Sequence, residues 1–423
     1  MEGACKSSKF EPEDFISGMP DIVVTNILNR LPLQEAVRTG ILAKNWRLKW
    51  TMLSQLVLDK NFYNYLLRRK AEKNYGTIIS RLLLHLKGVI TKFVIYAGRR
   101  ILNDEDINHL LLFLCRNGIK DLTLYNDQKA PLELPIHLFS CMELKRLVLT
   151  GCRFDPPTSF HGFPSLLSLE LYNVRLKNGK FGQFFTHCPT LETLDMDFTN
   201  SPGKVKLVEI AKLKNLKILS LSLYNLDNPK IRSSIIFELA GCLPQLQELH
   251  LDFWYTEFIV DVAKRGLPVT FPCVKTLSIS RINVGTGMNS LCALEIISSF
   301  PNLQSFEIRE TKWLFLQNIV PTTGVHLPEV DYSTTGLLQL RSVVLGVVIG
   351  SDDELCLIEH VLARSPFLKK IVIHYHSEYD EPLFARKLLK LHRASPLAEI
   401  DLVDGGMKLN RLLESSGDNF DDD

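Results

Sequence analysis

Residues 243–253 read LPQLQELHLDF, and this stretch decides the fold. Leu246, Leu249 and Leu251 follow the pattern apolar-x-x-apolar-x-apolar. The last two apolar positions lie two residues apart, so they share one face of a short strand. Pro244 stands two residues before the pattern and, because proline cannot continue a preceding helix, it ends the connecting segment. The stretch therefore predicts a short strand that is entered from a turn and is buried on one face.

The same six-residue pattern recurs along most of the chain, with 22 to 37 residues between successive starts. Because stacked copies bury the faces that a single copy leaves exposed, the repetition predicts one continuous core. Proline precedes six copies at the same offset, as Pro164, Pro189, Pro244, Pro272, Pro301 and Pro366. The copies begin at Ile90, Ile119, Leu144, Leu166, Leu191, Leu216, Leu246, Val274, Leu303, Leu340 and Leu368, and LSQLVL at Leu53 reads as an opening copy.

This repetition resembles a long and irregular leucine-rich repeat. The resemblance implies an α/β solenoid, in which a curved parallel sheet carries helices or turns on its convex side. The segment 233–243, SSIIFELAGCL, has helical spacing and is an example of such a connection. An ordinary α/β domain with units of similar length is the alternative. Eleven copies of one template favour the solenoid, because doubly wound sheets seldom exceed about six strands.

Composition narrows the class of protein. The chain has 423 residues, 46% hydrophobic and 23% charged, with a net charge of only +2, which gives no whole-chain attraction to nucleic acid. The nine cysteines show no zinc-binding or disulfide spacing, and no apolar run reaches the length of a membrane span. No signal-peptide core, nucleophile elbow or phosphate-binding loop is present. We therefore expect a protein of the nucleus or cytoplasm without catalytic residues, cofactor or metal.

The first sixty residues differ from the repeats. Helical spacing predicts one helix over 24–31, a second over 33–41 and a third that places Trp46 and Trp50 on one face. Lys44, Arg47 and Lys49 would then form the solvated flank of the third helix. A nucleic-acid platform and a membrane-surface helix are alternatives for this aromatic and basic stretch. The near-neutral chain disfavours the first, and a helix of about two turns is short for the second.

Residues 16–50, ISGMPDIVVTNILNRLPLQEAVRTGILAKNWRLKW, resemble an F-box. The opening MPD, the IL and LP pairs, EAVRT and the closing K-x-W-R-x-x-W occur in order at family spacing. The family often has Leu at Met19, Ser at Gly40 and Ala43, Arg at Asn45 and Leu at Lys49. Residues 352–402, with SPFLKK, KLLKLHRASP and AEI, resemble the FBD region that closes many plant proteins of this kind.

The resemblance implies the substrate-recognition subunit of an SCF-type ubiquitin ligase. The F-box would bind a Skp-family adaptor and through it a cullin, while the repeats would hold an unknown protein target, without nucleic acid or membrane. A hormone-type receptor, a scaffold outside a ligase and an enzyme are the alternatives. Some adaptor-facing residues will pack within the helices themselves. The matching positions are Met19, Pro20, Val24, Ile27, Leu28, Leu31, Pro32, Ala36, Val37, Ile41, Leu42, Trp46 and Trp50.

The resemblance also divides the chain. We expect a disordered tail over 1–13, the F-box over 14–54 and a helical linker or capping region over 55–89. Leucine-rich repeats would occupy 90–331, and an FBD-like region with the final repeats 332–404. An acidic disordered tail would follow over 405–423, where the sequence ends in GDNFDDD.

The strand positions that point away from the core are candidates for binding the target. They are rich in carboxylates, which favours a basic segment of the target, and a tryptophan just beyond them would add an apolar anchor. The alternative is that these are simply the polar residues of any solvent-facing strand. The candidates are Glu170, Tyr172, Asp195, Asp197, Glu248, His250, Asp252, Trp254, Glu307 and Arg309.

Overall fold

The computed structural model describes residues 18–98, 102, 104–176, 181–197, 207–223, 230–232, 241–253, 257–259, 273–281, 293–294, 296–309, 337–348, 351–375 and 381–404. The chain forms two compact units, Met1–Phe163 and Pro164–Asp423, and each is described by itself. The predicted tails over 1–13 and 405–423 lie outside the described residues, as does most of the helix predicted over 233–243. The predicted domain boundaries stay predictions.

The amino-terminal unit begins with short helices and continues with parallel strands. Its helices are α1 Asp21–Leu28, α2 Leu33–Arg38, α3 Lys60–Arg68, α4 Tyr75–His85 and α5 Asp104–Arg116. The 3-10 helices are η1 Thr39–Ile41, η2 Lys44–Trp46, η3 Lys49–Met52, η4 Glu72–Asn74 and η6 Ile136–Ser140. The strands are β1 Gln55–Leu58, β2 Lys92–Tyr96, β3 Asp121–Tyr125, β4 Leu132–Glu133, β5 Arg146–Thr150 and β6 Cys152–Phe154.

The carboxyl-terminal unit continues the same alternation. Its larger sheet has the strand order β7-β9-β10-β12-β14-β15-β16-β17-β18, and every neighbouring pair is parallel. The strands are β7 Ser168–Tyr172, β8 Arg175–Leu176, β9 Thr193–Asp197, β10 Ile218–Ser222, β11 Lys230–Arg232, β12 Glu248–Asp252, β13 Glu257–Ile259, β14 Thr276–Ser280, β15 Ser305–Arg309, β16 Ser342–Val348, β17 Lys370–Tyr375 and β18 Glu399–Asp404. The helices are α6 Phe181–Thr186, α7 Leu207–Ile210, α10 Asp352–Arg364 and α11 Glu381–Leu389.

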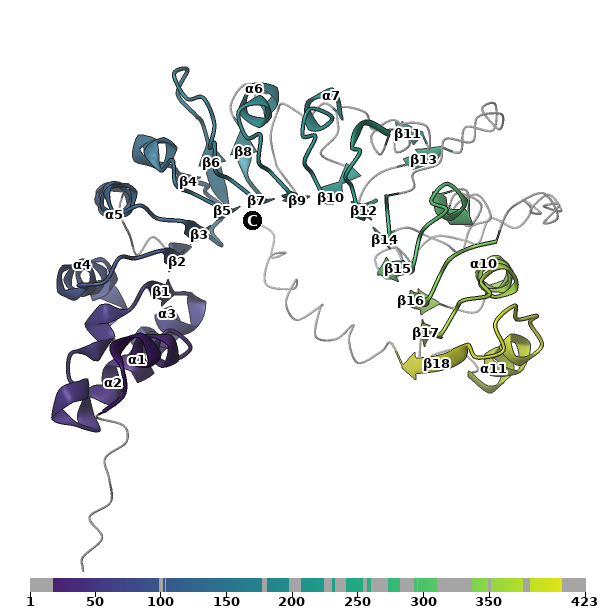
Figure 1. Ribbon diagram of the computed structural model, residues 1–423, viewed down its shortest axis with the longest axis horizontal. Coiled ribbons are helices and arrows are strands. Elements are labelled where there is room, and N and C mark those ends of the chain that lie inside the picture. Colours follow the sequence, from purple (N-terminus) through teal and green to yellow (C-terminus); the bar gives the residue numbers. More distant parts are fainter. Residues whose placement is uncertain are drawn as a thin grey trace, which may run out of the picture. The chain divides into compact units, whose positions relative to one another are not determined.

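The repeat pattern predicted these strands correctly. Each of the eleven copies, and the opening copy at Leu53, begins two residues before a strand of the larger sheets. The first, fourth and sixth positions form the core, as Leu246, Leu249 and Leu251 show with at most 1% of each residue exposed. Burying one such leucine stabilises the fold by roughly 1.5–3 kcal/mol. The connecting helices lie on one side of the strand row in each unit (Figure 1), which is the leucine-rich-repeat solenoid that the sequence predicted.

One further strand of the larger sheet, β18, escaped the prediction. Residues 397–402, LAEIDL, follow the same pattern, and β18 pairs in parallel with β17 along its length. Leu397, the first apolar residue of this copy, is 82% exposed, whereas Leu368 in the preceding copy is 1% exposed. In the part of the chain that the structure describes, no later repeat covers this copy. An incomplete core at the end of the sheet therefore distinguishes the last repeat from the others.

Candidate functional site

The amino-terminal helical module, residues 18–54, contains two α-helices and three 3-10 turns. The predicted third α-helix is wrong, because extended Ala43 and non-helical Leu48 divide residues 39–52 into η1, η2 and η3. The chain folds back at this point, and a Cβ atom on Gly40 would lie 3.1 Å from the backbone of Arg47. The glycine thus permits a close approach of two backbone segments, which its helix propensity alone does not reveal.

The module packs against the first strand of its own unit. The Asn29 side-chain oxygen accepts hydrogen bonds from the backbone N–H groups of Ser54 and Gln55, both at 3.3 Å. The Asn29 amide donates to the Ser54 hydroxyl at 3.0 Å. These bonds satisfy backbone groups where β1 begins, a role that a further strand would otherwise fill. Lys49 pairs with Asp21 and holds η3 against the start of α1.

The two tryptophans have different surroundings. Trp46 is buried, with only 5% of the residue exposed, and forms part of the core of the helical module. Trp50 is half-buried, and its ring centroid lies 6.2 Å from that of His85 at the end of α4. The prediction that both rings lie on one face of a helix was wrong, because they lie on separate 3-10 turns. Trp46 therefore stabilises the module, and Trp50 joins it to the first repeats.

The thirteen predicted adaptor-facing residues divide into a core set and a surface set. Val24, Leu28, Ala36 and Trp46 are buried, whereas Met19 and Trp50 are partly exposed. The remaining seven are exposed at the surface of the module: Pro20, Ile27, Leu31, Pro32, Val37, Ile41 and Leu42. Ile41 is 85% and Leu42 69% exposed, which is unusual for adjacent large apolar side chains. The structure thus brings an apolar surface to the outside of the module.

Sequence reasoning missed four further members of this surface. Ile22 is 72% and Leu48 58% exposed, and Val23 and Met52 are also exposed. Val24 and Leu28 form the buried face of α1. Ile22 and Val23 lie on other faces of this helix and are therefore left exposed. A module of this length cannot bury all its apolar residues. The number of apolar residues in excess of what it can bury is the sequence signal that could have indicated this exposed surface.

The predicted target-binding residues whose side chains the structure describes lie on the polar side of the larger sheet of the carboxyl-terminal unit. The registers place Glu170 opposite Asp195, and His250 opposite Ser278, in one row that crosses the strands. Tyr172 donates from its hydroxyl to Asp195 at 2.9 Å and to Glu170 at 3.4 Å. Burial and the two carboxylates raise the pKa of Tyr172 above its ordinary value, so the hydroxyl keeps its proton and remains a donor.

Most of the described carboxylates in this set have partners. Asp252 accepts a hydrogen bond at 2.7 Å from Nε of Arg281, a residue that the sequence pattern did not single out. Glu307 forms an ion pair with Arg309 at 2.9 Å, and Glu248 lies 3.7 Å from His250. The Asp197 side chain and Trp254 lie outside the described residues. The acidic character that the sequence suggested is therefore largely compensated locally, and binding of a basic target there stays a prediction.

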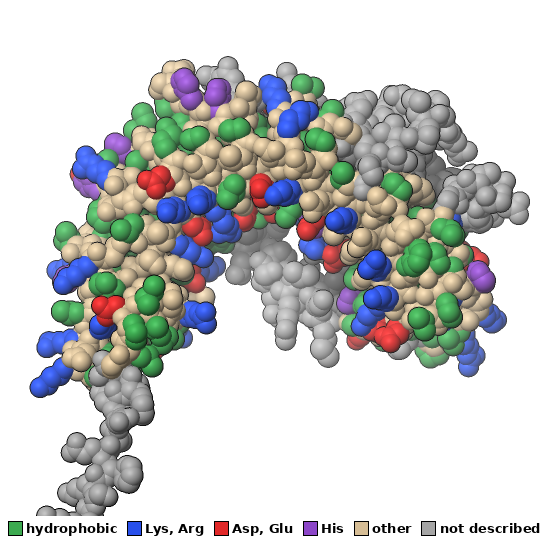
Figure 2. All heavy atoms as spheres, viewed as in Figure 1, with side chains coloured by type: hydrophobic (Ala, Val, Ile, Leu, Met, Phe, Trp, Pro, Cys, Tyr) green, Lys and Arg blue, Asp and Glu red, His purple; other side chains and the backbone are tan. Residues whose placement is uncertain are grey.

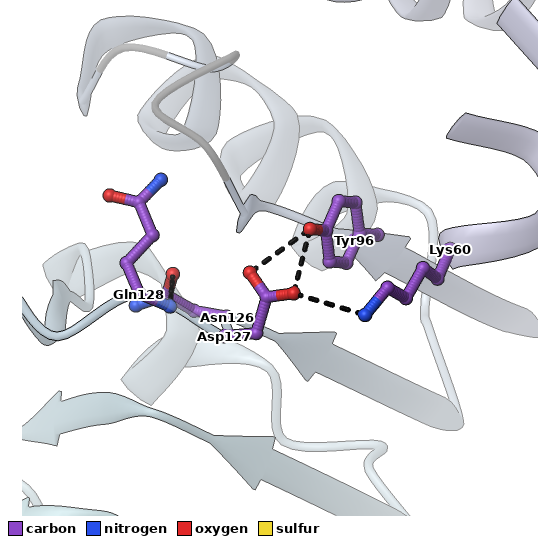
Figure 3. Close-up of polar contacts among 5 residues, drawn as sticks. All are labelled: Lys60, Tyr96, Asn126, Asp127 and Gln128. Atoms are coloured by element: carbon purple, nitrogen blue, oxygen red, sulfur yellow. Dashed lines mark hydrogen bonds and ion pairs between the residues drawn. The ribbon is translucent and has the colours of Figure 1, made fainter. Parts of the chain in front are cut away.

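A second polar cluster lies in the amino-terminal unit, where β2 and β3 end (Figure 3). The Tyr96 hydroxyl donates to both carboxylate oxygens of Asp127, at 3.0 and 2.8 Å, and Lys60 lies 3.4 Å from the same carboxylate. The Tyr96 ring packs between those of Tyr63 and Tyr125, with centroids 5.2 and 5.8 Å away. Tyr96 and Tyr125 each follow the sixth position of an early repeat copy, and the template predicts that this position faces away from the core. We interpret the cluster as structural, because it joins α3 to the first two repeats.

Comparison with known proteins places the chain in a family. It is 30% identical to the F-box/FBD/LRR-repeat protein At1g13570 of Arabidopsis thaliana over 92% of this chain and 98% of that protein. The chain belongs to the F-box/FBD/LRR-repeat family. A family model described as "FBD-associated F-box protein At5g56370, LRR repeats" matches residues 107–223. The FBD-associated F-box protein At4g10400 of the same plant is 28% identical over 65% of this chain and 68% of that protein.

A solved structure is also similar to this F-box/FBD/LRR-repeat protein. It is the LRR ectodomain of the plant membrane receptor kinase GASSHO1/SCHENGEN3 from Arabidopsis thaliana, with 14% identity and a TM-score of 0.34. The match covers 75% of this chain and 40% of that one. In the described ranges no helix is long and apolar enough to cross a bilayer. The same residues contain no group of three His, Cys, Asp or Glu side chains arranged to hold a metal ion.

Proposed function

We propose that the protein is the substrate-recognition subunit of an SCF-type ubiquitin ligase. The helical module binds a Skp-family adaptor, which connects the chain to a cullin, and the repeats hold the protein to be ubiquitinated. The chain carries out no chemistry itself. It raises the effective concentration of the target near a ubiquitin-loaded enzyme elsewhere in the complex. Action in the nucleus or cytoplasm forms part of the proposal.

The observation that carries the proposal is the apolar surface of the helical module. Ile41 and Leu42 are adjacent and exposed, and Ile22 and Leu48 add two more large apolar side chains to the same small module. Burying one such side chain in an interface contributes roughly 1.5–3 kcal/mol, so a few anchors suffice for stable association. Membership of the F-box/FBD/LRR-repeat family supports a Skp-family adaptor as the partner of this surface.

The test is binding of the full chain to an immobilised Skp-family adaptor. We expect the double variant Ile41→Asp/Leu42→Asp to bind at least about tenfold more weakly, because two charges would be desolvated in an apolar interface. Both side chains are exposed, so circular dichroism should show an unchanged fold. The matched control is Leu84→Asp/Val89→Asp, which adds the same charges at exposed apolar positions of the same unit but outside the module. Equal adaptor affinity for all three proteins, or no affinity of the unsubstituted chain, would contradict the proposed function.

A further inference from the structure

A row of polar side chains runs along the amino-terminal edge of the larger sheet in the carboxyl-terminal unit. Its members occupy the second position of successive repeat templates, just before each strand. The backbone N–H of each member after the first donates to the carbonyl of the member before it, at 2.8 or 2.9 Å, and the N–H of Lys217 donates to the carbonyl of Glu192 at 2.8 Å. The backbone of the row is therefore as regular as the sheet itself. We call it the edge row: Lys217, Gln247, Lys275, Gln304, Arg341 and Lys369.

The edge row carries uncompensated positive charge. Lys217 pairs with Glu192 at 2.7 Å. Lys275, Arg341 and Lys369 are exposed and form no ion pair with any other residue that the structure describes. The carboxylates on the adjoining strand face, by contrast, have Arg281, Arg309 and Tyr172 as partners. Figure 2 shows Lys and Arg side chains along this rim of the unit, with a few carboxylates beside them.

The spacing of the edge row matches an extended peptide. Neighbouring strands lie about 4.8 Å apart, so Lys217, Lys275 and Arg341, each two strands from the next, follow one another at intervals of about 10 Å. An extended chain rises about 3.3 Å per residue, so three of its residues span the same distance. Gln247 and Gln304 stand between the cations, and their amides can both donate to and accept from a peptide backbone.

We propose that the edge row binds an extended acidic peptide segment with a carboxylate at every third residue, lying across the strands. The inference rests on the proposed function in one respect, which is that the segment belongs to the protein held for ubiquitination. Charge complementarity is between successive peptide carboxylates and Lys217, Lys275 and Arg341, while Lys369, on the strand next to that of Arg341, adds positive charge at that end. The intervening glutamines fix the register through hydrogen bonds to the peptide backbone.

A nucleic acid fits the edge row less well than an acidic peptide. Its phosphates form a continuous line of negative charge, and its binding increases with the number of phosphates neutralised. From Lys217 to Arg341 the edge row alternates cations with neutral glutamines, and carboxylates at Glu192, Glu248 and Glu399 lie on the same edge. Those carboxylates would repel a phosphate backbone, whereas a peptide can place neutral residues opposite them.

The test uses a fluorescein-labelled Ser/Thr peptide that carries four glutamates, one at every third position. Its binding to the full chain in complex with a Skp-family adaptor is measured by fluorescence anisotropy. A comparison peptide has the same composition with its four glutamates contiguous. We expect the spaced peptide to bind about tenfold more tightly than the comparison peptide, and Lys275→Glu/Arg341→Glu to weaken that binding at least about tenfold. The matched control is Lys212→Glu/Lys390→Glu, which makes the same charge change at exposed lysines outside the edge row.

Three results would overturn the inference. Equal affinity for the two peptides would show attraction to net charge without register. Equal weakening by Lys275→Glu/Arg341→Glu and by the control variant would remove the edge row as the site. Tighter binding of a single-stranded RNA oligonucleotide than of the spaced peptide would assign the row to nucleic acid. In each case the adaptor complex is already formed in the assay, so the proposed function stands or falls separately.

Discussion

Replacing Trp46 with alanine is expected to lower the free energy of unfolding of the helical module by about 3–5 kcal/mol, the usual cost of truncating a buried large aromatic side chain. Trp46 is 5% exposed although η2, which carries it, is only three residues long. Because so short a turn has little stability of its own, the packing of the Trp46 indole must stabilise it. The measurement is hydrogen exchange of the backbone amides over 21–53 in the full chain, which reports the opening free energy of this module directly.

Two further variants define what the Trp46 result means. Trp46→Phe retains most of the buried area, so its loss of stability should be clearly smaller. Trp50→Ala removes a half-buried ring whose centroid lies 6.2 Å from that of His85, and we expect a cost of about 1 kcal/mol. Similar losses for Trp46→Ala and Trp50→Ala would contradict the distinction between a core residue and a connecting residue. If Trp46→Ala opens the module as expected, any loss of adaptor binding by this variant follows from unfolding. Ile41→Asp/Leu42→Asp, by contrast, should bind the adaptor weakly while its hydrogen-exchange protection stays unchanged.

The repeats could be predicted from the sequence because their physical requirement is local. Two apolar residues spaced two apart, with a third before the turn, specify a strand buried on one face, and stacking repeats that requirement. The pattern therefore identified β12 from Leu246, Leu249 and Leu251 without information about any other strand. The prediction passed over β18, although residues 397–402 fit the template and Pro396 stands directly before Leu397.

The helical module was less predictable because its last third depends on contacts between residues distant in space. The spacing of Trp46 and Trp50 is helical, and local sequence alone favours a continuous helix. The observed path instead depends on the close approach of Gly40 to the backbone of Arg47 and on extended Ala43. Tertiary packing overrides a weak local preference here, as it often does for segments of one or two turns.

The candidate binding surfaces show the same limit. The template correctly placed Asp195, Asp252 and Glu307 on the solvent-facing side of the strands. It could not show that Arg281 would reach Asp252, because that pairing depends on where the chain turns after β14. Counting carboxylates therefore overstated the free negative charge of the face. Electrostatic character depends on which charges are paired, and pairing is a property of the folded chain.

Acidification is expected to destabilise the carboxyl-terminal unit through His360 in α10. His360 is 4% exposed, and its Nε2 accepts a hydrogen bond at 2.8 Å from Nη1 of Arg364, one turn later. Acceptance requires a neutral imidazole, and burial together with the charge of Arg364 lowers the pKa of His360 from 6.5 to about 4. Because the unfolded chain binds the proton near pH 6.5 and the folded chain does not, stability is complete above that pH and falls as the pH drops toward 4.

The expected loss is about 2 kcal/mol at pH 5 and about 3 kcal/mol at pH 4, measured by urea denaturation followed by circular dichroism. His360→Gln keeps an acceptor for Arg364 and carries no titratable group, so it should remove this part of the pH dependence while costing little at neutral pH. His392→Gln, at an exposed position of the same unit, is the matched control and should leave the pH dependence as it is. An identical decline of stability with pH in the unsubstituted chain and in His360→Gln would show that this buried imidazole is not the group responsible. A decline confined to the chains that retain His360 would place the acid-sensitive point at the pair that joins two successive turns of α10.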